Sequence, residues 1–542
     1  MKNVKKIVNK DANNVYKTAN TVNHEGGKAW AMSDACLLDQ MCMLGTLGNC
    51  FYAKAKDSIP ENIELLQRST PEALAAAIVK GRNFGYVRAF NILGLVYLSM
   101  KQETDSAQKN LFAAAFPQVI RTGNDLKDFI DLCRSTGRKF GRAVKNAIRA
   151  WIDEKLNPYY AMKYRSEIAD AIRICRYKGD GNALVIYCLG HYNNVVGMDA
   201  ERLDQAMEVQ PELAALGKVR ALLEKPEITV AEEAKIVKMI AEFNIDTESL
   251  QSVYDKMTLP IWTAVAKATP TMRFLKYSNK FIEVGIFQDK ANMAIVKDKL
   301  SVERLKRAYV FPFRLYTAYK ALLTTQTNAQ PRQAVANHIA STLDQYTTAF
   351  DWGVFNRCSW LICPDVSGSM RKPASGDLSC SAVAGMFSGF LYKGLDNALV
   401  VPWDTGAHDH TVPKGDSVIS HISAIEKATG GGTFMEAPIR HAIQNKIQAD
   451  WVVMLTDNEE YGSGWLAAWV DYKKKNPKAG AILINLCSST KTNPYPADKA
   501  KQLKIFQVFG WNDNALSFIK AQVSTDFPDL ATSVANQEKV EE

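Results

Sequence analysis

The sequence predicts a multidomain protein in which an all-α region of helical repeats is followed by a doubly wound α/β domain. From about residue 30 to 345, apolar residues recur at the 3.6-residue spacing of helices, with breaks at short polar, Gly or Pro points. After a junction at 350–357, apolar strands alternate with helices, which is the order of a doubly wound sheet. A chain of 542 residues is also too long for a single core.

The helical region is expected to pack as successive pairs of helices, in the manner of an α-solenoid, although no strict sequence period is present. Its expected helices lie at 71–80, 84–100, 141–155, 161–177, 230–243, 302–323 and 334–345. The α/β region is expected to have strands at 360–364, 398–403, 451–456, 481–486 and 505–509. Helices are expected between and after these strands, at 382–393, 419–427, 436–446, 465–474 and 515–520.

Oxygen-bearing side chains follow the expected strands of the α/β region. The first strand ends in an Asp-x-Ser-x-Ser motif, a Gly-Gly-Gly-Thr segment follows later, and a further strand ends in Thr-Asp. The carboxyl ends of parallel strands meet at one edge of a sheet, where such folds bind ligands. The candidate metal ligands are all hard oxygen donors that suit Mg²⁺ or another hard divalent cation: Asp365, Ser367, Ser369, Thr433 and Asp457.

This pattern resembles the metal-ion-dependent adhesion site of von Willebrand factor A-type (vWA) domains. The alternative is that Ser367 and Ser369 only cap the helix that follows them, and that Asp457 caps another. Three matching segments in the right order favour the metal site. No candidate base or nucleophile accompanies the five oxygens, so we expect a binding site without catalytic residues, in which the cation keeps a position open for a carboxylate or phosphate.

The positive charge of the chain is concentrated in the helical region. Residues 351–542 hold 18 basic and 21 acidic residues, which leaves 48 basic and 36 acidic residues of the total 66 and 57 for residues 1–350. The two regions therefore have net charges of −3 and +12. A polyanion such as a nucleic acid is expected to bind the helical region.

Basic residues are densest between residues 121 and 178, where they are about twice as frequent as acids. Arg138, Arg142, Lys145 and Arg149 have the spacing of one helix face, and a second cluster follows: Lys163, Arg165, Arg173, Arg176 and Lys178. Interleaved tyrosines, such as Tyr159 and Tyr164, could stack on bases. The alternative is a solvated helix face. A further basic stretch between residues 267 and 314 is equally compatible with core helices.

The remaining composition indicates a soluble cytoplasmic protein. The ten cysteines show no Cys-x-x-Cys pair, and several lie in apolar runs, as buried reduced thiols do. The basic N-terminus is not followed by an apolar signal core, and no apolar stretch is long enough to span a bilayer.

In combination, these features resemble the Ro autoantigen family of RNA-binding proteins, which joins a TROVE module to a vWA domain. The resemblance covers about residues 20–525 and suggests a bacterial or phage-like member. It rests on the following motifs: Gly137-Arg138-Lys139-Phe140-Gly141-Arg142, Ala161-Met162-Lys163-Tyr164, Pro312-Phe313, the Asp-Val-Ser-Gly-Ser-Met segment from Asp365, Gly431-Gly432-Thr433, and Thr456-Asp457-Asn458-Glu459.

The resemblance implies a ring of HEAT-like helical repeats over residues 20–350, closed by a vWA domain over 351–530. It implies a monomeric, non-catalytic RNA-binding scaffold, with small structured (Y-like) RNA on an outer basic surface and 3′ ends of misfolded RNA in a central hole. An exoribonuclease tethered through the RNA is an implied partner, and RNA quality control is the implied role. The RNA-binding candidates are Arg138, Arg142, Lys145, Lys163, Arg165, Arg173 and Arg176. A metal-dependent adhesion module and a metal-dependent nuclease that uses Asp365 and Asp457 remain the alternatives.

Overall fold

The fold is taken from a computed structural model. It describes residues 18–44, 55–85, 87–101, 106–179, 181–191, 200–308, 310, 312–324, 327–375, 378–428, 430–461, 463–487, 490–510 and 513–524. The expected signal-free N-terminus and the polar tail from 527 to 542 lie outside these residues.

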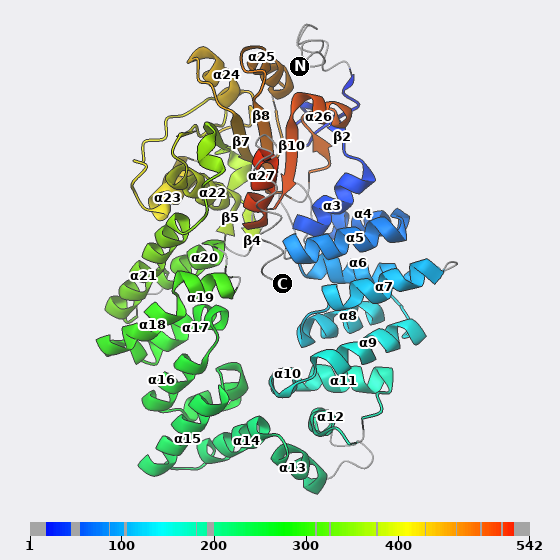
Figure 1. Ribbon diagram of the computed structural model, residues 1–542, viewed down its shortest axis with the longest axis vertical. Coiled ribbons are helices and arrows are strands. Elements are labelled where there is room, and N and C mark those ends of the chain that lie inside the picture. The colour runs from blue at the N-terminus through cyan, green and yellow to red at the C-terminus, as the bar shows by residue number, and fades with distance from the viewer. Residues whose placement is uncertain are drawn as a thin grey trace.

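Two arms of helices leave the α/β domain and return to it (Figure 1). The first arm contains α3 (Asp34–Leu44), α4 (Ala55–Arg68), α5 (Pro71–Lys80), the π-helix η2 (Gly81–Gly85), α6 (Ala89–Met100), α7 (Ser106–Val119), α8 (Gly123–Ser135), α9 (Arg142–Lys155), α10 (Pro158–Lys163), α11 (Arg165–Cys175) and α12 (Ala183–Leu189). Capping residues determine where several of these helices begin. Thr122, for example, forms a capping box with Asp125 at the start of α8.

The second arm runs back to the α/β domain (Figure 1). It contains α13 (Ala200–Glu208), α14 (Pro211–Leu223), α15 (Val230–Phe243), η3 (Glu248–Lys256), α16 (Leu259–Ala268), α17 (Thr271–Glu283), η4 (Ile286–Gln288), η5 (Lys290–Asn292), α18 (Met293–Lys299), α19 (Val302–Arg307), α20 (Pro312–Leu323) and α21 (Ala329–Thr348). The short helix η6 (Phe355–Arg357) then leads into the first strand of the α/β domain.

The α/β domain is built on a parallel sheet with the order β10-β8-β7-β3-β6. Its strands are β3 (Trp360–Pro364), β6 (Ala398–Val400), β7 (Trp451–Thr456), β8 (Gly480–Asn485) and β10 (Ile505–Phe509). Every residue of β3, β7 and β8 is buried, as expected for central parallel strands covered on both faces. A small hairpin, β4 (Pro373–Ser375) with β5 (Leu378–Ser379), and the 3₁₀ turn η7 (Gly368–Arg371) follow β3.

Alternate residues of the strands serve two different cores, so helices cover both faces of the sheet. Trp360 and Ile362 pack in one core with α22 (Cys380–Gly394), α23 (Val418–Ala428) and α27 (Asp513–Ser524). Leu361 and Cys363 pack in the other core, with α24 (Ala437–Gln444), α25 (Trp465–Lys475), the short helix η8 (Ala497–Lys499) and α26 (Ala500–Leu503) along that side.

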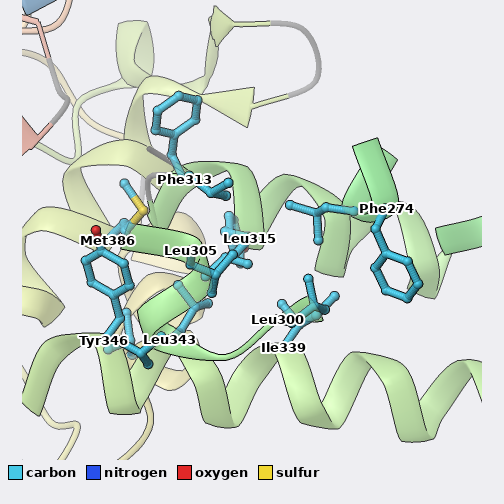
Figure 2. Packing of buried hydrophobic residues seen from close by; sticks show 14 of the residues in the cluster. Phe274, Leu300, Leu305, Phe313, Leu315, Ile339, Leu343, Tyr346 and Met386 are labelled. Atoms are coloured by element: carbon cyan, nitrogen blue, oxygen red, sulfur yellow. The ribbon is translucent and has the colours of Figure 1, made fainter. Parts of the chain in front are cut away.

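The first core continues without interruption from the sheet into the second arm. It includes residues from Ala215 to Val523. Figure 2 shows Met386 of α22 beside Tyr346 of α21, with Leu305, Leu315 and Phe274 of the second arm beyond them. The first arm has a separate core that runs from Leu38 to Cys188 and also includes Leu213 of α14. The second arm is thus fused to the α/β domain by apolar packing, whereas the first arm must join it in another way.

The N-terminal segment makes that second connection. Strand β1 (Thr21–Val22) pairs with β2 (Lys28–Ala31), and β2 pairs in turn with β9 (Thr492–Asn493) of the α/β domain. Gln40 of α3 donates a hydrogen bond of 2.7 Å to the carbonyl of Thr490. The chain therefore starts on the α/β domain, passes through both arms and ends on the same domain, which closes its path.

Helix α10 connects the two arms on their inner side (Figure 1). Lys163 forms an ion pair of 2.9 Å with Glu248 of η3, and Arg273 of α17 donates a hydrogen bond to the hydroxyl of Tyr159. Arg273 also forms an ion pair with buried Asp246. These polar contacts join segments that are about 100 residues apart in the sequence.

The observed fold confirms the predicted fold class, and three expected strands and two expected helices (71–80 and 230–243) have the observed bounds. Two predictions of single helices were wrong. The expected helix at 161–177 is interrupted at Tyr164, whose φ and ψ of −121° and 37° are not helical. The expected helix at 302–323 is divided into α19 and α20, because Pro312 lacks the N–H that a continuous helix needs.

The prediction that Arg138 lies on the same helix face as Arg142 was also wrong. Helix α8 ends in a Schellman turn in which Gly137 has a φ of 71° and the N–H of Arg138 bonds to the carbonyl of Cys133. Arg138 therefore lies in the connection before α9, which begins at Arg142.

Among the described cysteines none forms a disulfide, and most are buried. No helix in the described part of the chain combines the length and the apolar composition needed to cross a bilayer.

Candidate metal centre and basic surface

The predicted metal ligands come together at the carboxyl edge of the sheet. Asp365 directly follows β3 and Asp457 directly follows β7, and these two strands are neighbours in parallel register. The isolated bridge between Ser367 and Gly431 brings the glycine-rich loop to the same edge, and the N–H of Gly368 bonds to the carbonyl of Gly431 at 2.8 Å. Three segments that are distant in the sequence thus meet at one place.

A chain of hydrogen bonds links four of the five ligands. The hydroxyl of Ser367 bonds to Asp365 and lies 3.1 Å from the hydroxyl of Ser369, which bonds to Asp457. Thr433 is nearly fully buried, and its carbonyl accepts a hydrogen bond of 2.8 Å from the N–H of Tyr461, in the loop after β7. Three loops that carry the five candidate ligands therefore meet at this edge of the sheet.

The carboxylates at this edge are buried without a cationic partner. Asp365 has an exposed fraction of 0% and Asp457 of 3%, and no described lysine or arginine forms an ion pair with either of them. Burial, followed by the neighbouring charge of Asp457, raises the pKa of Asp365 to about 8, although hydrogen bonds from Ser367 and Thr456 oppose the shift. Burial likewise raises the pKa of Asp457.

Two buried acids without a counter-charge must take up either a proton or a cation. Two carboxylates, three hydroxyls and no nitrogen or sulfur donor form a set that suits Mg²⁺. Among the described residues no group of three His, Cys, Asp or Glu side chains could hold a metal ion, so the hydroxyls are needed to complete the set. The residues present therefore fit a hard divalent cation.

Several residues outside the predicted ligand set support the five ligands. The hydroxyl of Thr456 donates to Asp365 at 2.7 Å, and Thr490 donates to the carbonyl of Asp457 at 2.6 Å. Asp404 fixes the glycine-rich loop by accepting from the N–H of Gly431 at 3.1 Å. Although burial favours its neutral form, hydrogen bonds from His408 and Gly406 keep the pKa of Asp404 below its ordinary value. The carboxylate of Asp404 is thus engaged in hydrogen bonds with the backbone of Gly431 and the side chain of His408.

The seven predicted RNA-binding residues divide into two groups. Three of them hold the fold together. Arg138 donates to the hydroxyl and the carbonyl of Ser99, Lys163 pairs with Glu248, and Arg165 donates to the carbonyl of Tyr187 at 2.8 Å with its guanidinium over that ring. Their charges are therefore partly used within the helical domain.

The other four residues lie on a surface that we call the α9/α11 basic surface: Arg142, Lys145, Arg173 and Arg176. Helices α9 and α11 pack against each other, and Arg149 of α9 donates to the carbonyl of Cys175 at the end of α11. Arg142, Arg173 and Arg176 are exposed and Lys145 is half-buried. Within the described residues, Arg142, Lys145 and Arg176 form no ion pair, so their charge is available to a partner.

The fold and the carboxylate-hydroxyl edge define a helical-repeat protein joined to a vWA domain. Residues 359–523 match the family model described as the Ro60 vWA domain. The chain is 24% identical over 471 residues to a Deinococcus radiodurans protein named RNA-binding protein RO60. The aligned part covers 81% of this chain and 83% of that protein. It is also similar to the crystal structure of the Deinococcus radiodurans RO (RSR) protein, with a TM-score of 0.61, 20% identity and coverage of 91% of this chain and 99% of that one.

These matches confirm the resemblance to the Ro family that the sequence suggests. Residues 359–523 form a vWA domain of the Ro60 type, and over 91% of the chain the fold is similar to that of a bacterial Ro protein.

The pKa shift of Asp365 predicts how stability depends on pH in the metal-free protein. The pKa is about 8 in the folded chain and has an ordinary value of 3.8. The folded protein therefore holds this proton more tightly than the unfolded chain, and the free energy of unfolding should fall as pH rises from about 4 to about 8. Denaturant unfolding in EDTA across this range measures the effect.

The variant Asp365→Asn cannot ionise, so without metal it should be more stable than the wild-type protein at pH of about 8 and should show a flatter dependence on pH. Asp409→Asn, which changes an exposed acid of the same domain, is the matched control and should behave like the wild type. A metal-free wild-type protein whose stability does not change across this range would contradict the assignment.

Proposed function

We propose that this protein is a non-catalytic RNA-binding scaffold of a ribonucleoprotein. In this proposal the α9/α11 basic surface binds small structured, Y-like noncoding RNA, and the inner side of the helical arms receives single-stranded 3′ ends of misfolded RNA. The protein would act in RNA quality control as a monomeric ring, with a tethered exoribonuclease as a further partner. The observation that carries the proposal is similarity over most of the chain to a protein named for RNA binding.

The charge distribution supports the same conclusion. The helical domain carries the net positive charge of the chain, and three cations of the α9/α11 basic surface have no acidic partner among the described residues. Phosphate groups are the natural partners of such a surface, and the guanidinium groups of arginine match phosphate oxygens in two-point hydrogen bonds.

The metal centre is proposed to hold Mg²⁺ through Asp365, Ser367, Ser369, Thr433 and Asp457. A bound Mg²⁺ would supply a Lewis-acidic centre that binds an anionic oxygen. The chain's own residues hold the ligand loops in place and keep water away from the two carboxylates. The bound cation would neutralise the two buried charges. This arrangement can bind a carboxylate or a phosphate without transferring any group.

A nuclease function is less well supported. Two-metal hydrolysis needs clustered carboxylates that are free to bind the second ion. Asp404 is engaged by Gly431 and His408, and Glu459 accepts a hydrogen bond from the backbone of His24. A metal-dependent protein-adhesion role remains the second candidate, because an open position on the cation would suit an acidic side chain.

Charge reversal on the α9/α11 basic surface should weaken RNA binding. The triple variant Arg142→Glu, Lys145→Glu and Arg176→Glu should lose most of its affinity for a small hairpin RNA, because like charges would then face the phosphates. Each lost phosphate contact should reduce the slope of log affinity against log salt by about 0.7 in a single-stranded part and about 0.9 in a duplex stem, which gives a change of about 2 to 3 for three contacts. Fluorescence anisotropy at several salt concentrations measures both quantities.

The matched control reverses three exposed lysines of α14 and α15 in the second arm: Lys218→Glu, Lys235→Glu and Lys238→Glu. It changes the net charge by the same amount at another place, so its affinity should fall much less. Equal losses in the two triple variants would show that only net charge matters and would contradict a defined surface. Lys163 and Arg165 are left unchanged because their reversal would break contacts within the fold.

Binding inside the ring of helices makes a separate prediction about RNA ends. A hairpin RNA with a single-stranded 3′ tail should compete better than the same hairpin with a blunt end, since only a free strand can enter between the arms. A hairpin with the same tail at its 5′ end is the control for tail length and charge. If all three RNAs compete equally, the 3′ end is not recognised.

A further inference from the structure

The short helix α10, on the inner side of the arms, carries a group of aromatic rings beside a lysine (Figure 1). The Nζ atom of Lys163 lies 4.9 Å from the ring centre of Tyr164 and 5.7 Å from that of Tyr159. Tyr160 and Tyr164 are stacked, with their ring centres 5.6 Å apart. Tyr164 is buried, whereas Tyr159 has an exposed fraction of 38%. The helix therefore presents one accessible ring next to one cation.

A second cation reaches the same ring from the other arm. The guanidinium of Arg273, at the start of α17, lies 5.6 Å from the ring centre of Tyr159, and Arg273 donates a hydrogen bond to the Tyr159 hydroxyl. We call Tyr159, Lys163 and Arg273 the α10 platform. An accessible aromatic ring beside two cations is the combination that binds a base and its phosphate in single-stranded nucleic acids.

A carboxylate of η3 lies where the α10 platform would bind a phosphate. The Oε2 atom of Glu248 is buried, 2.9 Å from Nζ of Lys163 and 3.4 Å from a guanidinium nitrogen of Arg273. A carboxylate oxygen that faces two cations imitates a phosphate oxygen both in charge and as a hydrogen-bond acceptor. Within the folded chain, Glu248 therefore takes up the charge that the platform would offer to RNA.

The neighbouring acid Asp246 differs from Glu248 because it also holds the backbone. Asp246 is buried, forms an ion pair with Arg273 and accepts hydrogen bonds from the N–H groups of Glu248 and Ser249. It therefore caps the start of η3 in addition to fixing Arg273. Among the described residues, the ion pairs of Glu248 are with the α10 platform alone. Removal of the Glu248 charge should therefore leave η3 in place.

The contact between Glu248 and the platform is polar and lies between two apolar cores. Tyr164, next to Lys163, belongs to the core of the first arm, and Leu250 of η3 belongs to the core of the second arm, although half-buried Met162 touches both. The side chains of Lys163 and Glu248 keep exposed fractions of 21% and 22%, so water reaches the ion pair. Separation of the pair would expose charges and would leave both cores closed.

We infer that Glu248 is an autoinhibitory phosphate mimic, whose carboxylate covers a site on the α10 platform for one phosphate and the adjoining base of single-stranded RNA. The inference rests on the RNA-binding function proposed above and names the residues and the regulation of a site on the inner side of the arms. A phosphate that displaces Glu248 pairs with Lys163 and Arg273, and the base stacks on Tyr159. A duplex, whose bases already stack on one another, gains the phosphate contact alone.

The variant Glu248→Gln tests the inference, because it keeps the shape of the side chain and removes its charge. A purely structural ion pair would leave RNA affinity unchanged or lower it, whereas removal of an internal competitor raises it. In fluorescence anisotropy with a 5′-labelled oligouridylate of 12 nucleotides, Glu248→Gln should bind about threefold or more tightly than the wild type. The slope of log affinity against log salt should become steeper by about 0.7 or more. Glu248→Ala should show the same gain.

The matched control is Asp298→Asn. Asp298 pairs with Arg304 at 3.1 Å on the surface of the same arm, so this variant also frees one cation and raises the net charge by one. Its affinity for the oligouridylate should rise much less than that of Glu248→Gln. The base contact is tested in the Glu248→Gln background. Tyr159→Phe should retain the gain, whereas Tyr159→Ala should lose about fivefold or more in affinity because the stacking surface is removed.

The outcomes separate failure of the inference from failure of the proposed function. If Glu248→Gln binds no more tightly than the wild type or than Asp298→Asn, while the wild type binds RNA, Glu248 covers no site and the inference is overturned. Equal affinities of the Tyr159→Phe and Tyr159→Ala variants would overturn the base contact. If neither the wild type nor Glu248→Gln binds the oligouridylate or a hairpin RNA at low salt, the proposed function fails as well.

Discussion

Two buried carboxylates at the ends of neighbouring strands set the main constraint on this structure. Asp365 and Asp457 follow β3 and β7, lie in the interior and have no cationic side chain as a partner among the described residues. The surrounding loops carry hydroxyl side chains at the same edge of the sheet: Ser367 and Ser369, whose hydroxyls lie 3.1 Å apart, and Thr433 in the glycine-rich loop. A bound cation would neutralise the carboxylates and coordinate the hydroxyl oxygens. A proton on each carboxylate would also remove the charge, but it would not use the hydroxyl oxygens.

The two buried carboxylates also lie close to one of the two junctions between the helical arms and the vWA domain. The second arm is joined to the vWA domain by a continuous apolar core, but the first arm joins it through β2, Gln40 and the turn at Asn23–Gly27. This second junction is polar and lies directly against the loop after Asp457. The polar junction therefore lies next to the candidate metal centre. The α9/α11 basic surface and the candidate metal centre, which are separate in the sequence, belong to one closed chain path in the structure.

The sequence predicted the sheet well because buried strands have a local pattern, and the segments that carry the candidate metal ligands meet at one edge of that sheet. Buried parallel strands such as β3 and β7 are continuous apolar runs, and the ligands follow them at fixed spacing. The basic surface was predicted less well, because residue type alone does not show that Lys163 pairs with Glu248 or that Arg138 bonds to Ser99. The N-terminal junction was missed entirely. Strand β2 has four residues, too few to show a period, and its partner β9 lies about 460 residues away.

A crystal of the full chain grown in Mn²⁺ would test the central claim most directly, because Mn²⁺ accepts the same oxygen ligands as Mg²⁺ and scatters anomalously. The account predicts one strong anomalous peak between Asp365, Ser367, Ser369, Thr433 and Asp457. Electron density without a peak at this edge, with the two aspartates bonded only to protein groups, would contradict the claim that these buried charges exist to hold a metal ion.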